Sequence, residues 1–460
     1  MKTINEILDL NKRTPDEVIN ELKQKAIIIP DWFTINKEYD PMQHPVMDKA
    51  KYADVVNDNG TIDNVTRIIL DMQRLAVKRM SELCFGVPVK RIYNATSDKQ
   101  KEAAKIIEAV YQRNRIDAVN IERANMLFAG CEVLTLWYAV EGQNNIYGIN
   151  SPIKIRCRSF TPIRGDKLYP LFDENGDYIA VSINYKVRRG DRDVEYFDTY
   201  TTDRHLKWVY NDGWQVEEDE TIEIGKNPTL YMWRQAPIWE SSSCIVYEME
   251  WAMSRNGNYL RKNSKPVWVV CADEQISVGE EKNQDNEFRS ILQYPSGSTA
   301  NYVTWQQAIE NLKFYISELR QMFFSQLQLP DFSFENMKTT PMSGEARKQL
   351  FIDAQLKVKD ESGRLLEFLD REVNVVKAFV KVIAPKLSSD IDALQIETVI
   401  TPFTINDEKD TINNIMTATG GKAVLSQREG VEQLGWSSDV DKTMKELQEQ
   451  EQYDIFETTN

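Results

Sequence analysis

The chain has 460 residues and a mass of 53.4 kDa, and 42% of its residues are hydrophobic and 28% charged. This ordinary composition excludes wholesale disorder and a fibrous repeat, and the length allows roughly three domain-sized units or one elongated subunit of several parts. Asp and Glu number 71 against 56 Lys and Arg, so the net charge is −15. That balance argues against a stable nucleic-acid binder, because sequence-independent affinity for phosphates depends on cationic side chains.

Cysteine and histidine usage narrows the chemistry further. The five cysteines are spread singly without a CxxC pair, which favours reduced thiols in a cytoplasm. His44 and His205 are the only histidines, so the sequence offers almost no residues from which a histidine-based triad or a zinc site could be built. The N-terminal residues lack the apolar core of a signal peptide, and no window approaches the ~18 apolar residues of a membrane span. We therefore expect neither export by this route nor a membrane partner.

The first third of the chain predicts helices after an irregular arm. Residues 1–60 are mixed and polar, and indicate one short helix near the N-terminus. From Asp63, apolar residues recur at spacings of three and four, which predicts a helix. A capping box of Ser97 and Gln100 opens a second helix, and a third is expected over about 117–129.

Residues 131–240 change character and predict an antiparallel β region. Short runs rich in Val, Ile, Tyr and Thr are separated by the turn signals NGD, RGD and NDG. The RGD at 189–191 is interpreted as a hairpin turn and not as an adhesion site, because Gly is a typical turn residue. The fold class is therefore α+β.

Helices return in the following part of the chain. Ser243 is expected to cap the first, with Gly257 and its two flanking asparagines interrupting it. A buried strand and a poorly periodic acidic insert follow. A second helix opens at Thr304 and stops before Pro330. Its apolar stripe consists of Ile309, Leu312, Ile316, Leu319 and Phe323. We interpret this stripe as a packing surface, within the subunit or against copies of the chain.

The last part of the chain is again expected to be helical. After the loop 331–342, a long helix begins near Ser343 and runs without proline to Ala384. The acidic tail 404–460 is interpreted as a solvated helical segment. Its expected start and stop residues are Gly420, Gly421, Ser426, Glu429, Gly435 and Ser438.

No catalytic or cofactor-binding residues are expected. A nucleotide hydrolase needs the phosphate cradle G-x-x-x-x-G-K-[ST], because backbone amides and the Lys must converge on the phosphates. Gly421-Lys422 fails this pattern, since Met416 stands in place of the first Gly and Ala423 in place of the hydroxyl.

Two clusters of acidic residues, 217–220 and 273–287, are the remaining candidates for metal-dependent chemistry. Neither has a spacing that brings carboxylates together from a rigid element, so we interpret both as solvated turns with no metal site.

The order of these parts resembles one family. In residues 319–360 a helix ends at P-D-x-S, a loop follows, and S-G-x-A opens a long helix. The other matching segments are 63–89, 101–140, 228–262 and 423–452. This series is similar to the portal, or head-to-tail connector, proteins of tailed double-stranded DNA bacteriophages.

The resemblance implies an elongated portal-like subunit that assembles into a dodecamer ring. Its implied parts are a wing (1–240), a stem helix (241–264), a clip (265–303), a second stem helix (304–328), a tunnel loop (329–342), a long wing helix and return (343–403) and a helical crown (404–460). The implied location is the portal vertex of the capsid in the virion, after assembly in the host cytoplasm.

The resemblance also implies a function in DNA packaging and genome ejection, without enzymatic activity. Genomic DNA would pass through the ring with only transient contacts, which suits the charge of −15. The implied partners are other copies of the chain, the major capsid protein, the terminase large subunit and a head-completion or adaptor protein. The residues expected in the tunnel loop, which narrows the channel, are Asp331, Phe332, Phe334, Asn336, Met337, Lys338, Thr339, Thr340 and Met342.

Two alternatives stay open from the sequence. One is a carboxylate-dependent metal enzyme that acts on nucleic acid through the acids at 217–220 or 273–287. The other is a different ring-forming virion protein, such as a tail or baseplate component. Twelvefold rings in the electron microscope would select the portal, a monomer with Mg²⁺-dependent cleavage the enzyme, and rings of another symmetry the third.

Overall fold

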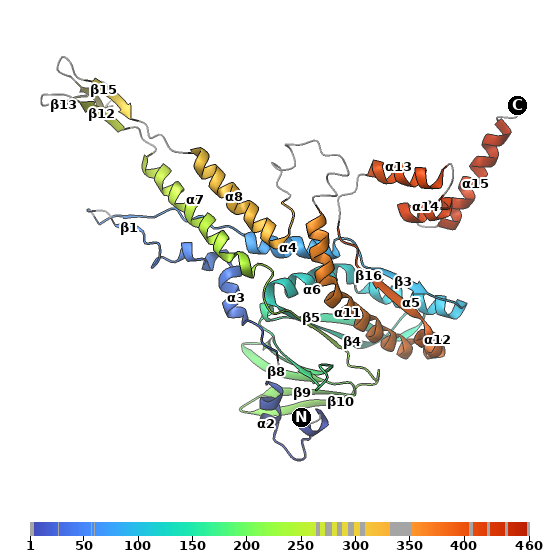
Figure 1. The fold of residues 1–460 in the computed structure, drawn as a ribbon. Coiled ribbons are helices and arrows are strands. Elements are labelled where there is room, and N and C mark those ends of the chain that lie inside the picture. The colour runs from blue at the N-terminus through green and yellow to red at the C-terminus, as the bar shows by residue number, and fades with distance from the viewer. Residues whose placement is uncertain are drawn as a thin grey trace.

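The computed structural model combines a layered body, a projecting helical stalk and a C-terminal helical segment (Figure 1). The residues described are 4–25, 27–56, 58, 60–263, 267–271, 278–282, 288–292, 299–303, 309–331, 351–403, 408–420, 424–437 and 440–457. The mixture of helices and sheets confirms the α+β class.

A five-stranded and a three-stranded antiparallel sheet form the middle of the body. The five-stranded sheet has the order β10-β9-β8-β7-β6, with β6 Lys167–Phe172, β7 Tyr178–Arg189, β8 Arg192–Tyr200, β9 Arg204–Tyr210 and β10 Trp214–Thr221. The three-stranded sheet has the order β11-β4-β5, with β4 Glu132–Asn144, β5 Ser151–Phe160 and β11 Thr229–Trp233. These strands confirm the β region predicted for 131–240, and the RGD lies at the β7–β8 turn.

The alternation of side chains along the strands stacks these sheets into layers. On β4, Val133 and Trp137 face the helices of the body, whereas Leu134 and Leu136 face the other sheet. On β8 of the five-stranded sheet, Phe197 faces away from the three-stranded sheet and packs against the N-terminal helices. The layers therefore run from N-terminal helices through the five-stranded and three-stranded sheets to a helical layer.

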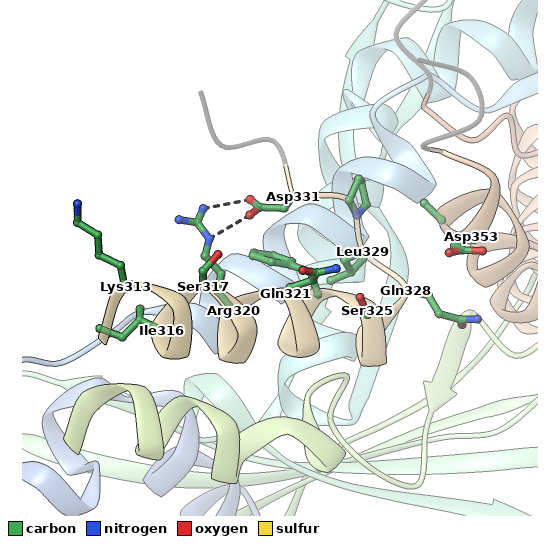
Figure 2. Close-up of a pocket in the computed structure, with 13 residues that line it drawn as sticks. Lys313, Ile316, Ser317, Arg320, Gln321, Ser325, Gln328, Leu329, Asp331 and Asp353 are labelled. Carbon is green, nitrogen blue, oxygen red and sulfur yellow. Dashed lines mark hydrogen bonds and ion pairs between the residues drawn. The ribbon is translucent and has the colours of Figure 1, made fainter. Parts of the chain in front are cut away.

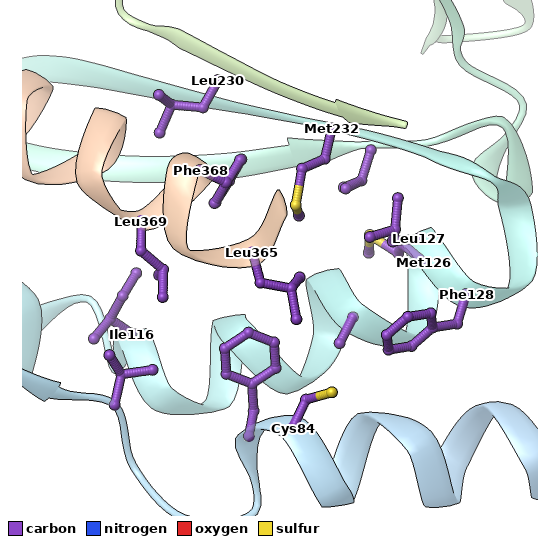
Figure 3. Packing of buried hydrophobic residues seen from close by; sticks show 14 of the residues in the cluster. Cys84, Ile116, Met126, Leu127, Phe128, Leu230, Met232, Leu365, Phe368 and Leu369 are labelled. Carbon is purple, nitrogen blue, oxygen red and sulfur yellow. The ribbon is translucent and has the colours of Figure 1, made fainter. Parts of the chain in front are cut away.

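The helical layer holds the largest core cluster (Figure 3). It contains α4 Met72–Phe85, α5 Asp98–Arg113, α6 Ile116–Gly130, α11 Ile352–Ile383 and α12 Ser388–Ala393. Leu365, Phe368 and Leu369 recur along α11 at helical spacing and pack between α6 and β11. The chain returns through β16 Gln395–Val399, which pairs with β3 Lys90–Asn94.

A buried ion pair joins this layer to the sheet. Arg123 of α6 lies with Nη2 2.7 Å from Oε1 of Glu372 on α11, and both residues are 1% exposed. The indole of Trp137 donates to the same carboxylate oxygen at 3.1 Å. Asn120 accepts from Arg123 at 3.1 Å. The pair fixes α6, α11 and β4 relative to one another.

The N-terminal region is more regular than the sequence analysis predicted. It contains α1 Ile4–Ile7, α2 Pro15–Leu22, α3 Trp32–Tyr39 and the 3₁₀ turns Pro41–Gln43 and Pro45–Met47. A capping box of Thr14 and Glu17 opens α2, with Pro15 at its first position. Val18 and Ile19 bury this short helix against the five-stranded sheet. The prediction of a single short helix was therefore wrong.

Two other boundaries differ from prediction. Residues 64–71 are extended and not helical, and α4 begins only at Met72. The first stalk helix runs through Gly257 without interruption. Both differences have one cause, because the extended segment lies along this helix, as described below.

The stalk consists of α7 Ser243–Asn263 and α8 Ile309–Leu327, with short strands beyond them (Figure 1). β12 Val267–Cys271 pairs with β15 Thr299–Val303, and β13 Val278–Lys282 with β14 Phe288–Leu292. The predicted acidic turn at 273–287 therefore includes a strand. Because residues 304–308 and 343–350 lie outside the described ranges, the predicted starts of the second stalk helix and of the long wing helix are not tested.

The remaining elements lie at the edges of these parts. The C-terminal segment comprises α13 Glu408–Thr419, α14 Gln427–Leu434 and α15 Val440–Glu457. The predicted capping box of Ser426 and Glu429 opens α14, and Gly435 ends it with a positive φ. The other short elements are β1 Val55–Val56, β2 Ile62–Asp63 and the 3₁₀ turns Pro162–Arg164, Glu240–Ser242 and Pro385–Leu387.

Candidate functional site: the stalk and its base

The predicted apolar stripe of α8 is buried only near the body. Leu319 is 6% exposed and Phe323 is fully buried. Leu312 and Ile316, further out, are half-buried. The side chain of Ile309 lies outside the described residues. The stripe is thus a packing surface at its inner end, and within the described part of the chain its outer end has no complete cover.

The apolar stripe of α7 shows the same gradient. Val246 and Met249 are 0% and 2% exposed where the helix leaves the body. Met253 is half-buried, and Leu260 is 51% exposed. Positions i, i+3, i+7 and i+14 lie on one helical face, so this is one continuous stripe. Both stalk helices therefore carry apolar surface beyond the reach of the body.

A different face of α7 binds the extended segment 64–71. The backbone N–H of Thr66 donates to Asn258 at 2.5 Å, that of Ile68 to Ser254 at 2.8 Å and that of Leu70 to Glu250 at 2.8 Å. The registers match because four helical residues rise about 6 Å and two extended residues about 6.6 Å. The side chains of α7 thus accept the backbone hydrogen bonds that a neighbouring β-strand would otherwise accept from the segment.

Gly257 allows the close approach of this segment. A Cβ atom at position 257 would lie 3.0 Å from Cγ2 of Thr66. The Gly that predicted a break is thus a packing position on an intact helix. Beyond it, Arg261 donates to the carbonyl of Asn64 at 3.3 Å.

A buried His–Glu pair holds the inner end of the same face. His44 and Glu250 are both fully buried, with Nδ1 and Oε1 2.7 Å apart. The other ring nitrogen of His44 lies 2.8 Å from the carbonyl oxygen of Glu38 and must donate to it. Burial disfavours the charged imidazole, but the hydrogen bonds to Glu250 and Glu38 outweigh this, so the pKa of His44 is raised. The pair connects α7 to the N-terminal region and to Leu70.

The inner end of α8 is a tight helix stop. The N–H of Leu329 donates to the carbonyl of Phe324 at 3.0 Å, and that of Gln328 to Ser325 at 3.1 Å. This is the Schellman pattern, with Leu329 and Phe324 both buried as its apolar contact. Gln328 occupies the left-handed position with φ of 55°, where Gly is usual. The chain is thereby turned sharply away from the stalk.

Asp331 is fixed at the base of the stalk immediately after this turn. Arg320 of α8 forms a bidentate pair with it, at 3.1 Å and 3.0 Å (Figure 2). Arg79 of α4 lies 3.7 Å from the same carboxylate and donates to the carbonyl of Pro330 at 2.6 Å. Two guanidinium groups from different helices therefore hold the point where the predicted tunnel loop departs.

A groove of about 730 Å³ opens beside this point (Figure 2). Ile316, Phe324 and Leu329 contribute its apolar lining. Lys313 lines the end of the groove that lies toward the N-terminus of α8 (Figure 2). Asp353 of α11 also lines the groove. The groove lies between the stalk and the long helix of the body.

Of the predicted tunnel-loop residues, only Asp331 belongs to the described part of the chain. Phe332, Phe334, Asn336, Met337, Lys338, Thr339, Thr340 and Met342 lie outside it. Arg79, His44 and the polar row Glu250, Ser254 and Asn258 were not predicted from the sequence. The i, i+4, i+8 spacing of that row was visible in the sequence, but its partner, a segment nearly two hundred residues earlier, was not.

The predicted solvated turn at 217–220 is instead part of β10, where the acids face cations of β9. Arg204 pairs with Asp219 at 2.7 Å, and Lys207 with Glu218 at 2.7 Å. His205, Glu218 and Glu220 bring one ligand atom each within 4.8 Å of one another. Glu218 is already paired with the Lys207 ammonium, which also lies 3.0 Å from Glu217, so ion pairing is the better account of these acids. The side chains of 273–287 lie outside the described residues.

Comparisons with known proteins place the chain in a family. The model of the family "Phage portal protein, SPP1 Gp6-like" matches residues 22–456. The chain therefore belongs to this family of phage portal proteins, which confirms the resemblance seen in the sequence. A search of curated proteins finds no match.

Solved structures from gene transfer agents are similar to the chain. A chain from the neck of an empty gene transfer agent particle with C6 symmetry has a TM-score of 0.40 and 11% identity, covering 87% of this chain and 95% of that one. A chain from the virion of a native gene transfer agent has a TM-score of 0.40 and 10% identity, covering 91% of this chain and 98% of that one. Among the described helices, none has the length and apolar character needed to span a bilayer.

Proposed function

We propose that the chain is the portal subunit of a tailed bacteriophage, forming the ring at one capsid vertex through which double-stranded DNA is packaged and ejected. The family match over residues 22–456 carries this proposal. The stalk supports it, because both of its helices present apolar stripes that the body covers only at the inner end. The proposed role is structural and requires no catalytic residue.

The proposed assembly contains twelve copies, with the stalk as stem, its outer strands as clip, the layered body as wing and the C-terminal helices as crown. Its partners would be the major capsid protein around the ring, the terminase large subunit during packaging, and a head-completion or adaptor protein afterwards. Uncovered apolar stripes favour permanent contacts between copies, since such surface is unstable in water.

Packaged DNA would pass along the axis of the ring with only transient contacts. A net charge of −15 lowers the residence of DNA on the protein by repelling phosphates. The loop 331–342 is proposed to narrow the channel and to gate DNA. Its first residue, Asp331, is held by Arg79 and Arg320, which would fix the loop to rigid elements of the fold.

Electron microscopy of the purified chain tests the proposal directly. Twelvefold rings with a central hole are the expected result. Monomers at micromolar concentration would contradict it, and rings of another symmetry would favour a tail or baseplate component.

Shortening the loop tests its proposed role separately. Removal of three residues within 336–340 should leave rings intact while changing packaging or DNA retention, because the root lies outside the deletion. Lys338→Glu should alter the salt dependence of any DNA contact and leave stability unchanged. The loop has no gating role if the shortened protein packages and retains DNA as the parent does.

A further inference from the structure

Residues 53–56, 58 and 60–63, here called the arm, project beside the stalk with exposed aliphatic side chains (Figure 1). Its strands β1 and β2 have two residues each. Val56 is 68% and Ile62 64% exposed, and Val55 is 37% exposed. Asp58 and Asp63 are exposed and have no ion-pair partner in the described part of the chain. A pair of strands this short is not stable alone, and its apolar side chains contribute to none of the core clusters.

The root of the arm is held against the stalk by hydrogen bonds and ring contacts. Arg67 donates to Asp54 at 2.8 Å and to the carbonyl of Tyr52 at 2.6 Å, which ties the two sides of the arm together. The Tyr52 ring packs edge-on against Trp251 of α7, with centroids 5.0 Å apart. The hydrogen bonds from residues 66, 68 and 70 to α7 continue this attachment. The arm is therefore attached to the stalk at its root, whereas the side chains of Val56 and Ile62 remain exposed.

The arm and the groove lie on opposite edges of the stalk. On α7, Glu250 faces the extended segment, whereas Glu248 accepts from Tyr315 of α8 at 3.0 Å. Side chains two positions apart on a helix point in directions that differ by about 200°. The extended segment and α8 therefore lie on opposite faces of α7. On α8, Ser317 lines the groove and is two residues from Tyr315, so the groove faces away from α7. The order across the stalk is arm, α7, α8, groove.

The arm and the groove are complementary in chemistry. The groove has a mixed lining in which the apolar Ile316, Phe324 and Leu329 lie among polar side chains. Lys313, toward the N-terminal end of α8, is exposed without an ion-pair partner in the described ranges. The arm offers three aliphatic side chains, flanked by two carboxylates that have no ion-pair partner among the described residues. The groove's volume of about 730 Å³ lies in the range of sites that enclose several side-chain-sized groups.

We propose that the arm of one copy binds in the groove of the next copy, with Val56 and Ile62 on the apolar lining and an arm carboxylate beside Lys313. Two different surfaces on opposite edges give a head-to-tail contact, which closes into a ring when the rotation permits. The inference rests on the proposed ring and names a contact that builds it.

Cysteine cross-linking in the assembled full chain tests the contact. The double variant Val56→Cys with Ser317→Cys, in a background with Cys157→Ser, Cys244→Ser and Cys271→Ser, should give a ladder of covalent multimers with a short bismaleimide. A mixture of the two variants that each carry one of these introduced cysteines in the same background should stop at dimers, since the remaining Cys84 and Cys131 are buried and each copy then has one accessible thiol. The matched control replaces Val56→Cys by Val140→Cys, a 43% exposed position on β4, and should give no ladder.

A charge swap provides a second measurement that does not depend on cysteine reactivity. Lys313→Glu should raise the concentration needed for ring formation at least tenfold, and adding Asp63→Lys should restore it. Intact rings without cross-links overturn the arm contact while leaving the ring in place. Cross-links confined to single chains, which would mean that each arm reaches its own groove, also overturn it. If the parent chain forms no ring at all, the proposed function itself fails.

Discussion

The body and the stalk bury their apolar residues in different ways. In the body, Trp137 and Phe197 are fully covered, and even the charged pair of Arg123 and Glu372 is enclosed. On the stalk, burial declines from Phe323 near the body to Leu260 further out. Since both regions carry periodic apolar stripes, the difference lies in what covers them. The body completes its own core, whereas the outer stalk has no complete cover within the described part of one chain.

The body should be the more sensitive region when one subunit is considered alone. Glu372→Ala leaves the Arg123 guanidinium buried without its partner, so the free energy of unfolding should fall by about 3–5 kcal/mol. Urea unfolding followed by tryptophan fluorescence measures this. The control Glu367→Ala removes an exposed pair with Arg371 and should cost no more than about 0.5 kcal/mol. Equal effects of the two variants would show that the body core is not closed as described.

Asp198 tests the same core through pH. Its carboxyl is 5% exposed between the sheets, one oxygen accepts from Tyr185 at 2.9 Å, and the other has no hydrogen bond in the described part of the chain. Burial raises the pKa of Asp198 from 3.8 to about 7. A folded-state pKa above the unfolded value penalises ionisation, so this group's contribution to stability falls as pH rises from about 4 to about 7.

Asp198→Asn should remove that fall. The free energy of unfolding at pH 8 should rise by up to about 4 kcal/mol, whereas at pH 4 the change should be small. Urea unfolding across this pH range gives the slope. A variant with the pH slope of the parent would refute the assignment.

The stalk should respond in assembly more than in folding. Leu312→Asp alters a half-buried side chain, so the subunit should lose only about 1 kcal/mol of unfolding free energy. Ring formation should nevertheless fail, because a neighbouring copy would bury the new charge unpaired. Sedimentation measures assembly and urea unfolding measures stability. Normal rings from this variant would place the stripe outside the interface.

Gln328 at the junction of the two regions should show the smallest effect. Its left-handed conformation is strained for any residue with a Cβ, so Gln328→Gly should raise the unfolding free energy by about 0.5–1 kcal/mol. The matched variant Ser325→Gly, three residues earlier within α8, should lower it by about 0.5 kcal/mol. A loss of stability in Gln328→Gly would mean that the turn is not strained.

Local patterns predicted the elements whose stability is local. The helix caps at Ser97 and Ser426 and the alternation in β4 and β8 were sufficient to place helices and strands, although the Gln100 side chain accepts from Thr96 and so does not complete the predicted capping box with Ser97. Prediction failed for 64–71 because its β-branched residues also fit a helical period. Only the contact with Glu250, Ser254 and Asn258 decides between these conformations, and no local pattern encodes it.

The candidate site was predictable to a similar degree. The stripe of α8 and the stop before Pro330 follow from periodicity and proline chemistry. The clamp on Asp331 does not, because Arg79 belongs to a helix some 250 residues earlier in the chain. The groove likewise needs α8 and α11 together, a juxtaposition that only the tertiary fold creates.

Hydrogen exchange in the assembled chain and in the Leu312→Asp subunit tests the dependence of the stalk on its neighbours most directly. Amides of residues 252–263 and 309–318 should exchange at least tenfold more slowly in the assembled chain, while those of α6 and β4 should exchange equally in both. Equal exchange of the stalk amides in the two samples would contradict the account, since it would show that the stalk is complete within one subunit.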